Sequence, residues 1–342
     1  MKSEKQSEIG FYTRTLNGHR QSYLDFVKKV FGGNRVEGIS LILRKQPLLF
    51  LMIEDNFLLY FIVGCIRALL GRRTAGLLFR PKPALEASNY RLKLKLMMLK
   101  FLKKIKSVRT LSIVPTPLEP SISEIVDDWI YDFQLWDITK EQKDIFQKIR
   151  NGNTNFKDMK EYEIANNIKN HAYGRKILIA LGVQNKGKGV HILSQYIDIF
   201  NQLDYLVVVA GRFDEVSAAP KKYLQNNGAL VFDRFMTDEE ILALYSVADV
   251  VWCYYDASYD QSSGILGRAI QLSVTPIVRK GSFSQLFCNN EKIIHISGED
   301  EINLRQQVIN FEESPFSQQQ STYSFESLSL IKLKAALGLG LR

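Results

Sequence analysis

The chain has 342 residues, of which 46% are hydrophobic and 24% are charged, and its formal net charge is +9. These values exclude a disordered or low-complexity protein, and the length favours two domains over one. The positive charge favours an anionic partner, which composition alone does not identify as nucleic acid, a phosphorylated ligand or an acidic membrane.

Cysteine spacing and the N-terminal residues indicate where the protein works. The three cysteines are far apart and show no CxxC spacing, which predicts a reduced, cytoplasmic protein without structural zinc. The first fifteen residues lack the apolar segment of a signal peptide, so we do not expect export by that route.

The first half of the chain shows a weak alternation of strands and helices. Residues 48–70 are its most hydrophobic region, but Glu54 and Asp55 divide it, and each remaining run is shorter than the ~20 residues needed to cross a bilayer. We therefore read this region as a buried strand, a loop and a helix. Other short apolar runs predict strands at 9–15, 74–80 and 110–114.

The second half alternates more clearly, and a helix is expected to begin at Thr237, with Glu240 completing a capping box. This alternation predicts a parallel sheet with helices on both faces, as in a Rossmann-like domain. Ligands of such sheets bind beyond the carboxyl ends of the strands. The predicted strands are 176–181, 205–211, 229–232, 249–255, 275–280 and 292–296.

A polar, asparagine-rich stretch at 150–170 is the predicted hinge region between the halves. We thus expect an N-terminal α/β domain at 1–170 and a C-terminal one at 171–321. A last helix, 322–337, is expected to pack back on the first domain.

The segment "GVQNKGKGVHIL" (182–193) follows the first strand of the second domain and leads into a helix. Backbone N–H groups at a helix start, together with an ammonium group, suit a phosphate. Lys188 is the first candidate ligand and Lys186 the second. The alternative is a solvated basic turn.

The segment "YDQSSGILGRAI" (259–270) has the same arrangement after the strand at 249–255. Ser262 or Ser263 is expected to cap the helix, and Gly264 lets a ligand approach the backbone. This site also suits a phosphate. The alternative is an ordinary helix start.

These segments together resemble GT-B glycosyltransferases, in particular glycosyltransferase family 4. The similar residues are "LGVQNKGKGVHIL", "YLVVVAGRFDE", "ALVFDRFMTDEEILALYSVADVVW" and "SSGILGRAIQLSVTPIV". The resemblance implies an α/β protein of the GT-B fold, with two Rossmann-like domains facing across a cleft and the nucleotide sugar held by the second.

The resemblance also implies roles for single residues. The family's phosphate-binding lysine corresponds to Lys188, and its nucleobase-binding loop corresponds to Arg234 and Phe235, with Arg212 a further donor-binding candidate. Its two glutamates, eight residues apart, fall on Asp260 and Arg268.

Two positions depart from the family pattern. Arginine cannot accept hydrogen bonds from a ribose, so Arg268 is expected to pair with Asp260, to bind a phosphate or to meet an anionic sugar. Val183 stands where the family has a phosphate-binding arginine, and Lys186 or Arg268 would supply the missing charge.

The first domain has its own candidates. Gly18 and His19 lie in a loop before a helix, where such enzymes cover the donor phosphates or the reacting sugar; the alternative is a structural or exposed histidine. Glu54 or Asp55 would orient acceptor hydroxyls or act as general base, unless they serve only as charges at a helix start. Asp260 completes the catalytic candidates.

Residues 91–106 combine apolar side chains at helical spacing with lysines on another face. Such a helix can lie on an anionic membrane, or it can be a core helix with solvated lysines. Nucleic acid is not expected as a partner, because no binding motif accompanies the charge.

The resemblance implies a hexosyl transfer from a nucleoside-diphosphate sugar, UDP rather than GDP, with retention of configuration and without a metal. The acceptor would be a saccharide or lipid-linked, in bacterial cell-surface glycan synthesis, with the enzyme cytoplasmic or at the inner face of the plasma membrane. Three alternatives stay open: a GT-B-fold sugar-nucleotide epimerase, a catalytically silent partner subunit and a basic adaptor.

Overall fold

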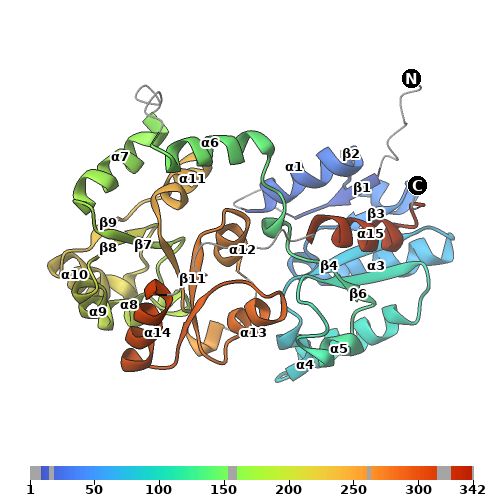
Figure 1. Ribbon diagram of the computed structural model, residues 1–342. Helices are drawn as coiled ribbons and strands as arrows, with labels where there is room; N and C mark the ends of the chain where they lie inside the picture. Colours follow the sequence, from blue (N-terminus) through green and yellow to red (C-terminus); the bar gives the residue numbers. More distant parts are fainter. Residues whose placement is uncertain (1–8, 15–18, 153–159, 260–262, 314–324, 341–342) are drawn as a thin grey trace. The chain divides into compact units, whose positions relative to one another are not determined.

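The computed structural model describes residues 9–14, 19–152, 160–259, 263–313 and 325–340 (Figure 1). Contacts divide the chain into two compact units. Unit 1 comprises residues 1–137 and 324–342, and unit 2 comprises residues 138–323. The units separate after Asp137, earlier than the predicted boundary at residue 170.

Unit 1 contains a six-stranded parallel sheet in the order β2-β1-β3-β4-β5-β6. Four of its strands were expected close to their observed positions, because their apolar runs are buried on both faces. The strands are β1 (Ile9–Tyr12), β2 (Gly33–Arg35), β3 (Leu48–Phe50), β4 (Thr74–Leu78), β5 (Val108–Ser112) and β6 (Asp128–Trp129).

Helices α3 and α5 pack against each other beside the sheet of unit 1, and α15 from the end of the chain packs against β4, β5 and β6. Right-handed crossovers from β3 to β4 and from β4 to β5 place α3 and α5 on the same face. The helices are α1 (His19–Phe31), α2 (Ser40–Leu43), α3 (Phe57–Leu69), α4 (Lys82–Glu86), α5 (Tyr90–Lys103) and α15 (Phe325–Leu337).

The acidic segment 126–132 contains the edge strand β6. Its buried Asp132 accepts a hydrogen bond of 2.8 Å from the Tyr23 hydroxyl. The apolar residues Val126 and Ile130 are buried as well, so this segment packs on unit 1 in spite of its charges.

Unit 2 contains a second six-stranded parallel sheet, in the order β12-β11-β10-β7-β8-β9. Five of the six predicted strand regions contain a strand, and β12 overlaps the sixth region, 292–296, only at Ile296. The strands are β7 (Lys176–Leu181), β8 (Tyr205–Ala210), β9 (Leu230–Phe232), β10 (Val250–Cys253), β11 (Thr275–Arg279) and β12 (Ile296–Gly298).

Helices cover both faces of this sheet, as the alternation predicts. On one face, α8, α9, α10 and α14 form a hydrophobic core together with inward residues of the strands. Leu193, Phe200 and Leu224 belong to the helices in this core, and Trp252 belongs to β10. On the other face α7 and α12 pack against strands, and α6 and α7 pack against α11. The packing on α11 explains why α6 and α7 belong to unit 2.

The helices of unit 2 are mostly short, and several are capped by the side chain of the residue just before the helix. The Thr237 capping box expected from sequence is present at α11. They are α6 (Lys140–Arg150), α7 (Lys160–Ala172), α8 (Val190–Gln195), α9 (Ile197–Gln202), α10 (Ala218–Asn226), α11 (Asp238–Val247), α12 (Gly264–Gln271), α13 (Phe283–Asn290) and α14 (Glu301–Glu313).

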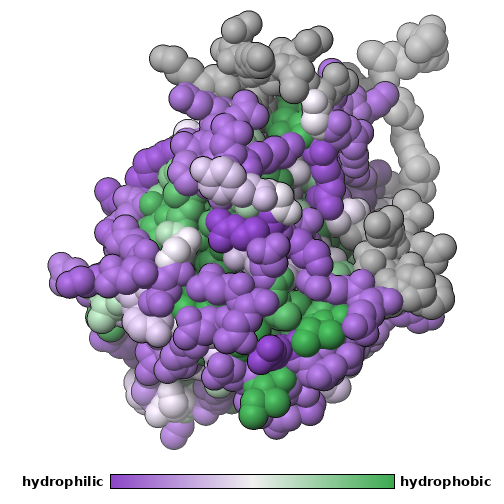
Figure 2. Space-filling view, turned by 60° about the vertical axis from the view of Figure 1, so that its left-hand side comes forward, coloured by the Kyte–Doolittle hydropathy of each residue, from purple (hydrophilic) through white to green (hydrophobic). Residues whose placement is uncertain are grey.

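Hydrophilic side chains cover most of the face of the molecule shown in Figure 2, and hydrophobic ones show between them. Within the described residues, no helix combines the length and the apolar character that crossing a bilayer requires.

Candidate functional site

The loops that follow the strands of unit 2 are joined to one another by hydrogen bonds. Gln184 N donates to Arg212 O at 2.7 Å, and Asp256 N donates to Gly187 O at 3.1 Å. Arg279 Nε donates to Tyr255 O at 3.1 Å. The carboxyl edge of the sheet is therefore one connected rim, where a parallel α/β sheet binds its ligands.

The loop after β7 holds Lys188 through its backbone. Asn185 accepts a hydrogen bond from Lys188 N at 2.9 Å and so caps a 3-10 turn, Lys186–Lys188. Gly189 follows with φ of +73°, and a Cβ atom there would lie 2.2 Å from Tyr254 O. Only glycine fits this position, which brings the lysine turn against the loop after β10.

The Lys188 ammonium lies among side chains from the loop after β10. It is 4.4 Å from the ring centroid of Tyr255 and 5.0 Å from that of Tyr259, within the range of cation–π attraction. It also lies 3.5 Å from Ser263 Oγ, which forms a 2.5 Å hydrogen bond with the Tyr255 hydroxyl. These contacts hold a positive charge at the start of α12.

Ser263 is the residue that caps α12. Its hydroxyl accepts a hydrogen bond of 3.3 Å from Ile265 N, and Gly264 is the first helical residue. The N–H groups of a first helical turn carry partial positive charge, and Lys188 adds a full charge beside them. The predicted candidates Asp260 and Ser262 lie outside the described residues.

Arg268 lies one turn further along α12 and is half-buried. Its Nη1 donates to Gln271 Oε1 at 3.2 Å, and Ile138 N donates to the same oxygen at 3.2 Å. The side chain is thus linked through Gln271 to the segment before α6. Its expected partner Asp260 is not among the described residues, so the role of Arg268 stays a prediction.

Lys186 is exposed beside an acidic residue that sequence reasoning overlooked. Asp256 accepts hydrogen bonds from Ser258 Oγ at 2.6 Å and Ser258 N at 2.9 Å, and these lower the pKa of its carboxyl group. His191 and Lys186 lower it further by charge attraction. The His191 ring nitrogen Nε2 lies 3.6 Å from the Asp256 carboxylate.

The other predicted donor residues lie along the rim towards β9. Arg212 is exposed after β8, and its carbonyl accepts the hydrogen bond from Gln184. Arg234 forms an ion pair of 2.5 Å with Glu240, while Phe235 is 75% exposed. The structure brings Lys188 and Ser263 together, whereas Arg234 is engaged with α11.

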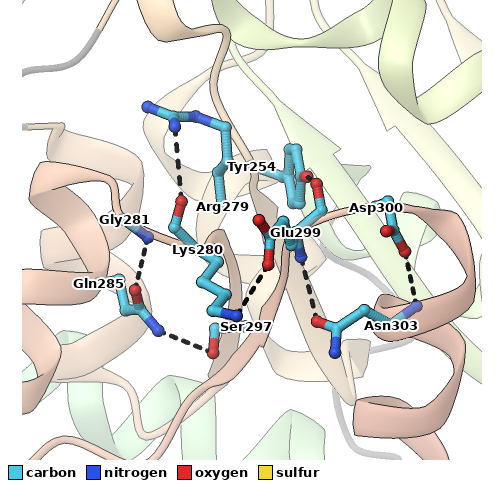
Figure 3. A network of polar contacts seen from close by, with 9 residues as sticks. All are labelled: Tyr254, Arg279, Lys280, Gly281, Gln285, Ser297, Glu299, Asp300 and Asn303. Carbon is cyan, nitrogen blue, oxygen red and sulfur yellow. Dashed lines mark hydrogen bonds and ion pairs between the residues drawn. The ribbon is translucent and has the colours of Figure 1, made fainter.

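Towards β12 the rim continues in a polar network (Figure 3). Lys280 Nζ lies 2.8 Å from Glu299, and the Tyr254 hydroxyl donates to Glu299 O at 3.0 Å. Gln285 connects the turn after β11 to strand β12, because it accepts a hydrogen bond from Gly281 N and donates one to Ser297 Oγ. This network fixes the end of β11, from which Arg279 reaches the Tyr255 carbonyl.

The sequence missed Tyr255, Tyr259, Asp256 and Arg279 as site residues. The signal was the run "YYDASY" directly after a strand, in a position where ligand-binding loops lie. Tyr255 had been counted only as part of the strand at 249–255, and Tyr259 only as the first residue of the segment 259–270.

The unit 1 candidates are spread over two loops. His19 is the first residue of α1, and Gly18 lies outside the described residues. Glu54 Oε1 accepts hydrogen bonds of 2.6 Å from Phe79 N and Arg80 N, and its Oε2 is buried with no hydrogen-bond partner. Burial raises the pKa of Glu54, against the opposing effects of these amides and Lys95.

Asp55 follows Glu54 in the 3-10 turn Ile53–Asn56, and its carbonyl accepts a hydrogen bond from Arg14 at 3.1 Å. Within the described parts of the chain, no three metal-ligating side chains gather into a cluster.

No protein-family model and no curated protein matches this sequence. Solved structures do match, over nearly all of the chain. An α,α-trehalose-phosphate synthase (UDP-forming) from Burkholderia vietnamiensis matches with a TM-score of 0.58 and 9% identity, covering 97% of each chain. WaaG, a glycosyltransferase involved in lipopolysaccharide biosynthesis, matches with a TM-score of 0.53 and 12% identity over 96% of this chain and 100% of its own.

The catalytic domain of starch synthase IV from Arabidopsis thaliana, bound to ADP and acarbose, matches with a TM-score of 0.53 and 10% identity. That match covers 95% of this chain and 79% of the synthase chain. The chain therefore has the GT-B fold of these glycosyltransferases, as its resemblance to the family predicts. At such low identity the likeness shows the fold alone.

Proposed function

We propose that this protein is a glycosyltransferase that moves a sugar from a nucleoside-diphosphate sugar to an acceptor hydroxyl. The observation that carries the proposal is the position of Lys188, held by two tyrosines and Ser263 where α12 begins. Structural neighbours that act on or bind such nucleotides support it, since one is UDP-forming and another was bound to ADP.

The site would act on the leaving group. Breaking the bond between the sugar and the diphosphate leaves negative charge on the phosphate oxygens. The Lys188 ammonium and the N–H groups of the first turn of α12 would stabilise that charge without having to reorganise. Arg279, which also contacts Tyr255, is a further cation on the same rim.

The finer assignments belong to the proposal. UDP is favoured over GDP, and a retaining hexosyl transfer without a metal follows from the family resemblance. The candidate donor ligands besides Lys188, Ser263 and Gly264 are Gly18, Lys186, Arg212, Arg234, Phe235, Ser262 and Arg268. The candidate catalytic groups are His19, Glu54, Asp55 and Asp260.

Unit 1 would bind the acceptor, which we propose to be a saccharide or a lipid-linked glycan of the bacterial cell surface. WaaG, a neighbour in lipopolysaccharide biosynthesis, supports this choice. Work at the cytoplasmic face of a membrane, contacted through residues 91–106, would bring the enzyme to such an acceptor.

The test is donor binding by the purified full chain. Thermal unfolding is followed with UDP, GDP, CMP and dTDP sugars, and we expect a selective rise with UDP sugars. Lys188→Ala should weaken nucleotide binding about tenfold or more, because a charge-assisted contact of ~1.5–3 kcal/mol is lost. Lys222→Ala, an exposed lysine on α10, is the matched control and should bind normally.

Other outcomes would replace the proposal. Conversion of the donor without any acceptor would identify an epimerase. Absence of binding to every nucleotide, with an intact fold, would identify a catalytically silent subunit.

A further inference from the structure

Helix α3 leaves an apolar stripe exposed, although its sequence suggests a fully buried helix. One side of α3 is buried through Tyr60, Val63 and Arg67. The other side carries Leu58, Ile62 and Leu69, the last of which is 89% exposed. Spacings of four and seven residues place these three side chains in one row along the helix.

Helix α5 continues the exposed apolar surface. Leu99 and Leu102 face the interior, whereas Leu94, Met97 and Phe101 are exposed, with Met97 at 67%. The rings of Phe61 on α3 and Phe101 on α5 lie 5.9 Å apart, so the two helices meet along this surface. We call it the α3–α5 face, made of Leu58, Ile62, Leu69, Leu94, Met97 and Phe101.

Positive charge surrounds the α5 part of this face. The chain has no acidic residue between Glu86 and Glu119, and this stretch contains six lysines and two arginines. Lys93 and Lys104 are exposed, and Lys100 pairs with Glu124 at 2.7 Å. The apolar face therefore lies beside a strongly basic border.

We propose that the α3–α5 face docks on the surface of a bilayer that contains anionic lipids. Six large apolar side chains exposed together are unusual for a protein that stays in water. The basic border matches anionic headgroups, each nearby lysine contributing ~1 kcal/mol. Each helix has 13 or 14 residues, enough to lie in the headgroup region but not to cross the bilayer.

This docking deepens the membrane contact proposed above for residues 91–106, because α3 supplies the other half of the face, and it goes beyond the proposed sugar transfer. It also stands without the proposed function, because membrane binding is measured without donor or acceptor. A failure of docking and a failure of nucleotide binding are thus separate results.

The experiment is sedimentation of the full chain with vesicles of phosphatidylcholine alone or mixed with phosphatidylglycerol. We expect binding to the mixed vesicles, weakened by salt, and little binding to the neutral ones. The α3 variant Ile62→Gln/Leu69→Gln and the α5 variant Met97→Gln/Phe101→Gln should each bind about tenfold more weakly or worse, because apolar burial is lost.

The matched control is Val216→Gln/Ile302→Gln, which changes two equally exposed apolar side chains of unit 2 and should bind as the original chain does. Circular dichroism and thermal unfolding confirm that each variant is folded. Unchanged binding of the α3 variant would overturn the proposal, as would equal binding to neutral vesicles. A lipid-free dimer that the α3 variant dissociates would assign the face to a second copy instead.

Discussion

At the residue scale, Gly189 is a position of the site where the backbone leaves little room for a side chain. It adopts φ of +73°, and its missing side chain gives room to Tyr254 O. Gly189→Ala should lower the free energy of unfolding by at least about 3 kcal/mol, because a strained backbone and a clash are combined. Gly228→Ala is the control, since Gly228 has φ of +85° and no atom near its Cβ position.

The control should cost only about 1 kcal/mol, the price of the left-handed conformation alone. Urea unfolding of both variants measures the difference. Equal losses would show that contact with the loop after β10 does not constrain Gly189.

Glu54 offers a second test at this scale, through pH. Burial raises its pKa above 4.5 in the folded chain. Its contribution to stability is therefore complete below the unfolded pKa and is lost as pH rises through the folded one. Glu54→Gln does not titrate, so the unfolding free energy of the original chain relative to this variant should fall as pH rises above the ordinary glutamate pKa of 4.5.

Urea unfolding at several pH values gives this difference directly. A difference that stays constant or rises with pH contradicts the assignment. The catalytic reading of Glu54 is judged separately by the turnover of the same variant.

At the element scale, α3 is tied to its neighbours by the buried Arg67. Its guanidinium donates to the carbonyls of Leu41, Arg44, Gln46 and Arg73 and to the Thr74 hydroxyl. A lysine ammonium cannot make all of these contacts, so Arg67→Lys leaves buried carbonyls without donors. It should lower the free energy of unfolding by at least about 3 kcal/mol. Arg72→Lys loses one contact, to Ile42 O, and should cost about 1 kcal/mol.

Hydrogen exchange locates the damage. We expect markedly faster exchange at residues 41–46 in Arg67→Lys, and a much smaller change there in Arg72→Lys, which loses a single contact to this segment. Uniform loss of protection over unit 1, with 41–46 no faster than the rest, would argue against a local clamp.

Elements also show what the sequence could predict. Strands β7, β8 and β11 were found because apolar runs between turn residues read the same in sequence and in a buried parallel sheet. Strand β2, with the sequence "GNR", has no such signal and forms through pairing with β1. Likewise, no local pattern says that Arg67 is buried or that Leu69 is exposed, since both depend on which side of α3 meets the sheet.

The candidate site also contains residues that could be predicted from the sequence and contacts that could not. Lys188 and Ser263 could be predicted, because each stands at a helix start after a strand. Their meeting with Tyr255 and Tyr259 could not, because it depends on β7 and β10 being neighbours in the sheet, although Lys188 and Ser263 are 75 positions apart in the chain. At the scale of the whole molecule, the boundary after Asp137 was missed for a related reason: α6 and α7 join unit 2 mainly by packing on α11, which lies far along the chain.

Each unit of the molecule contains a cysteine whose reactivity can report on the folding of that unit. Cys65 lies partly exposed in unit 1, and Cys253 and Cys288 are buried in unit 2. Burial raises the pKa of Cys253 to about 12, so its thiol reacts slowly while unit 2 is folded. With iodoacetamide in native buffer, mass spectrometry should therefore find Cys65 alkylated first.

In a urea series, the alkylation of Cys253 and Cys288 then reports the unfolding of unit 2. A nucleoside diphosphate that binds at Lys188 should move this transition to higher urea. At a hundredfold excess over its dissociation constant, it should raise the free energy of unfolding by about 2.7 kcal/mol. At the same nucleotide concentration, Lys188→Ala should lose about half of that shift or more, because its binding is about tenfold weaker or worse, and Lys222→Ala should keep it. A transition that no nucleotide moves, in a chain whose Cys253 is protected without ligand, would show that unit 2 does not hold the donor.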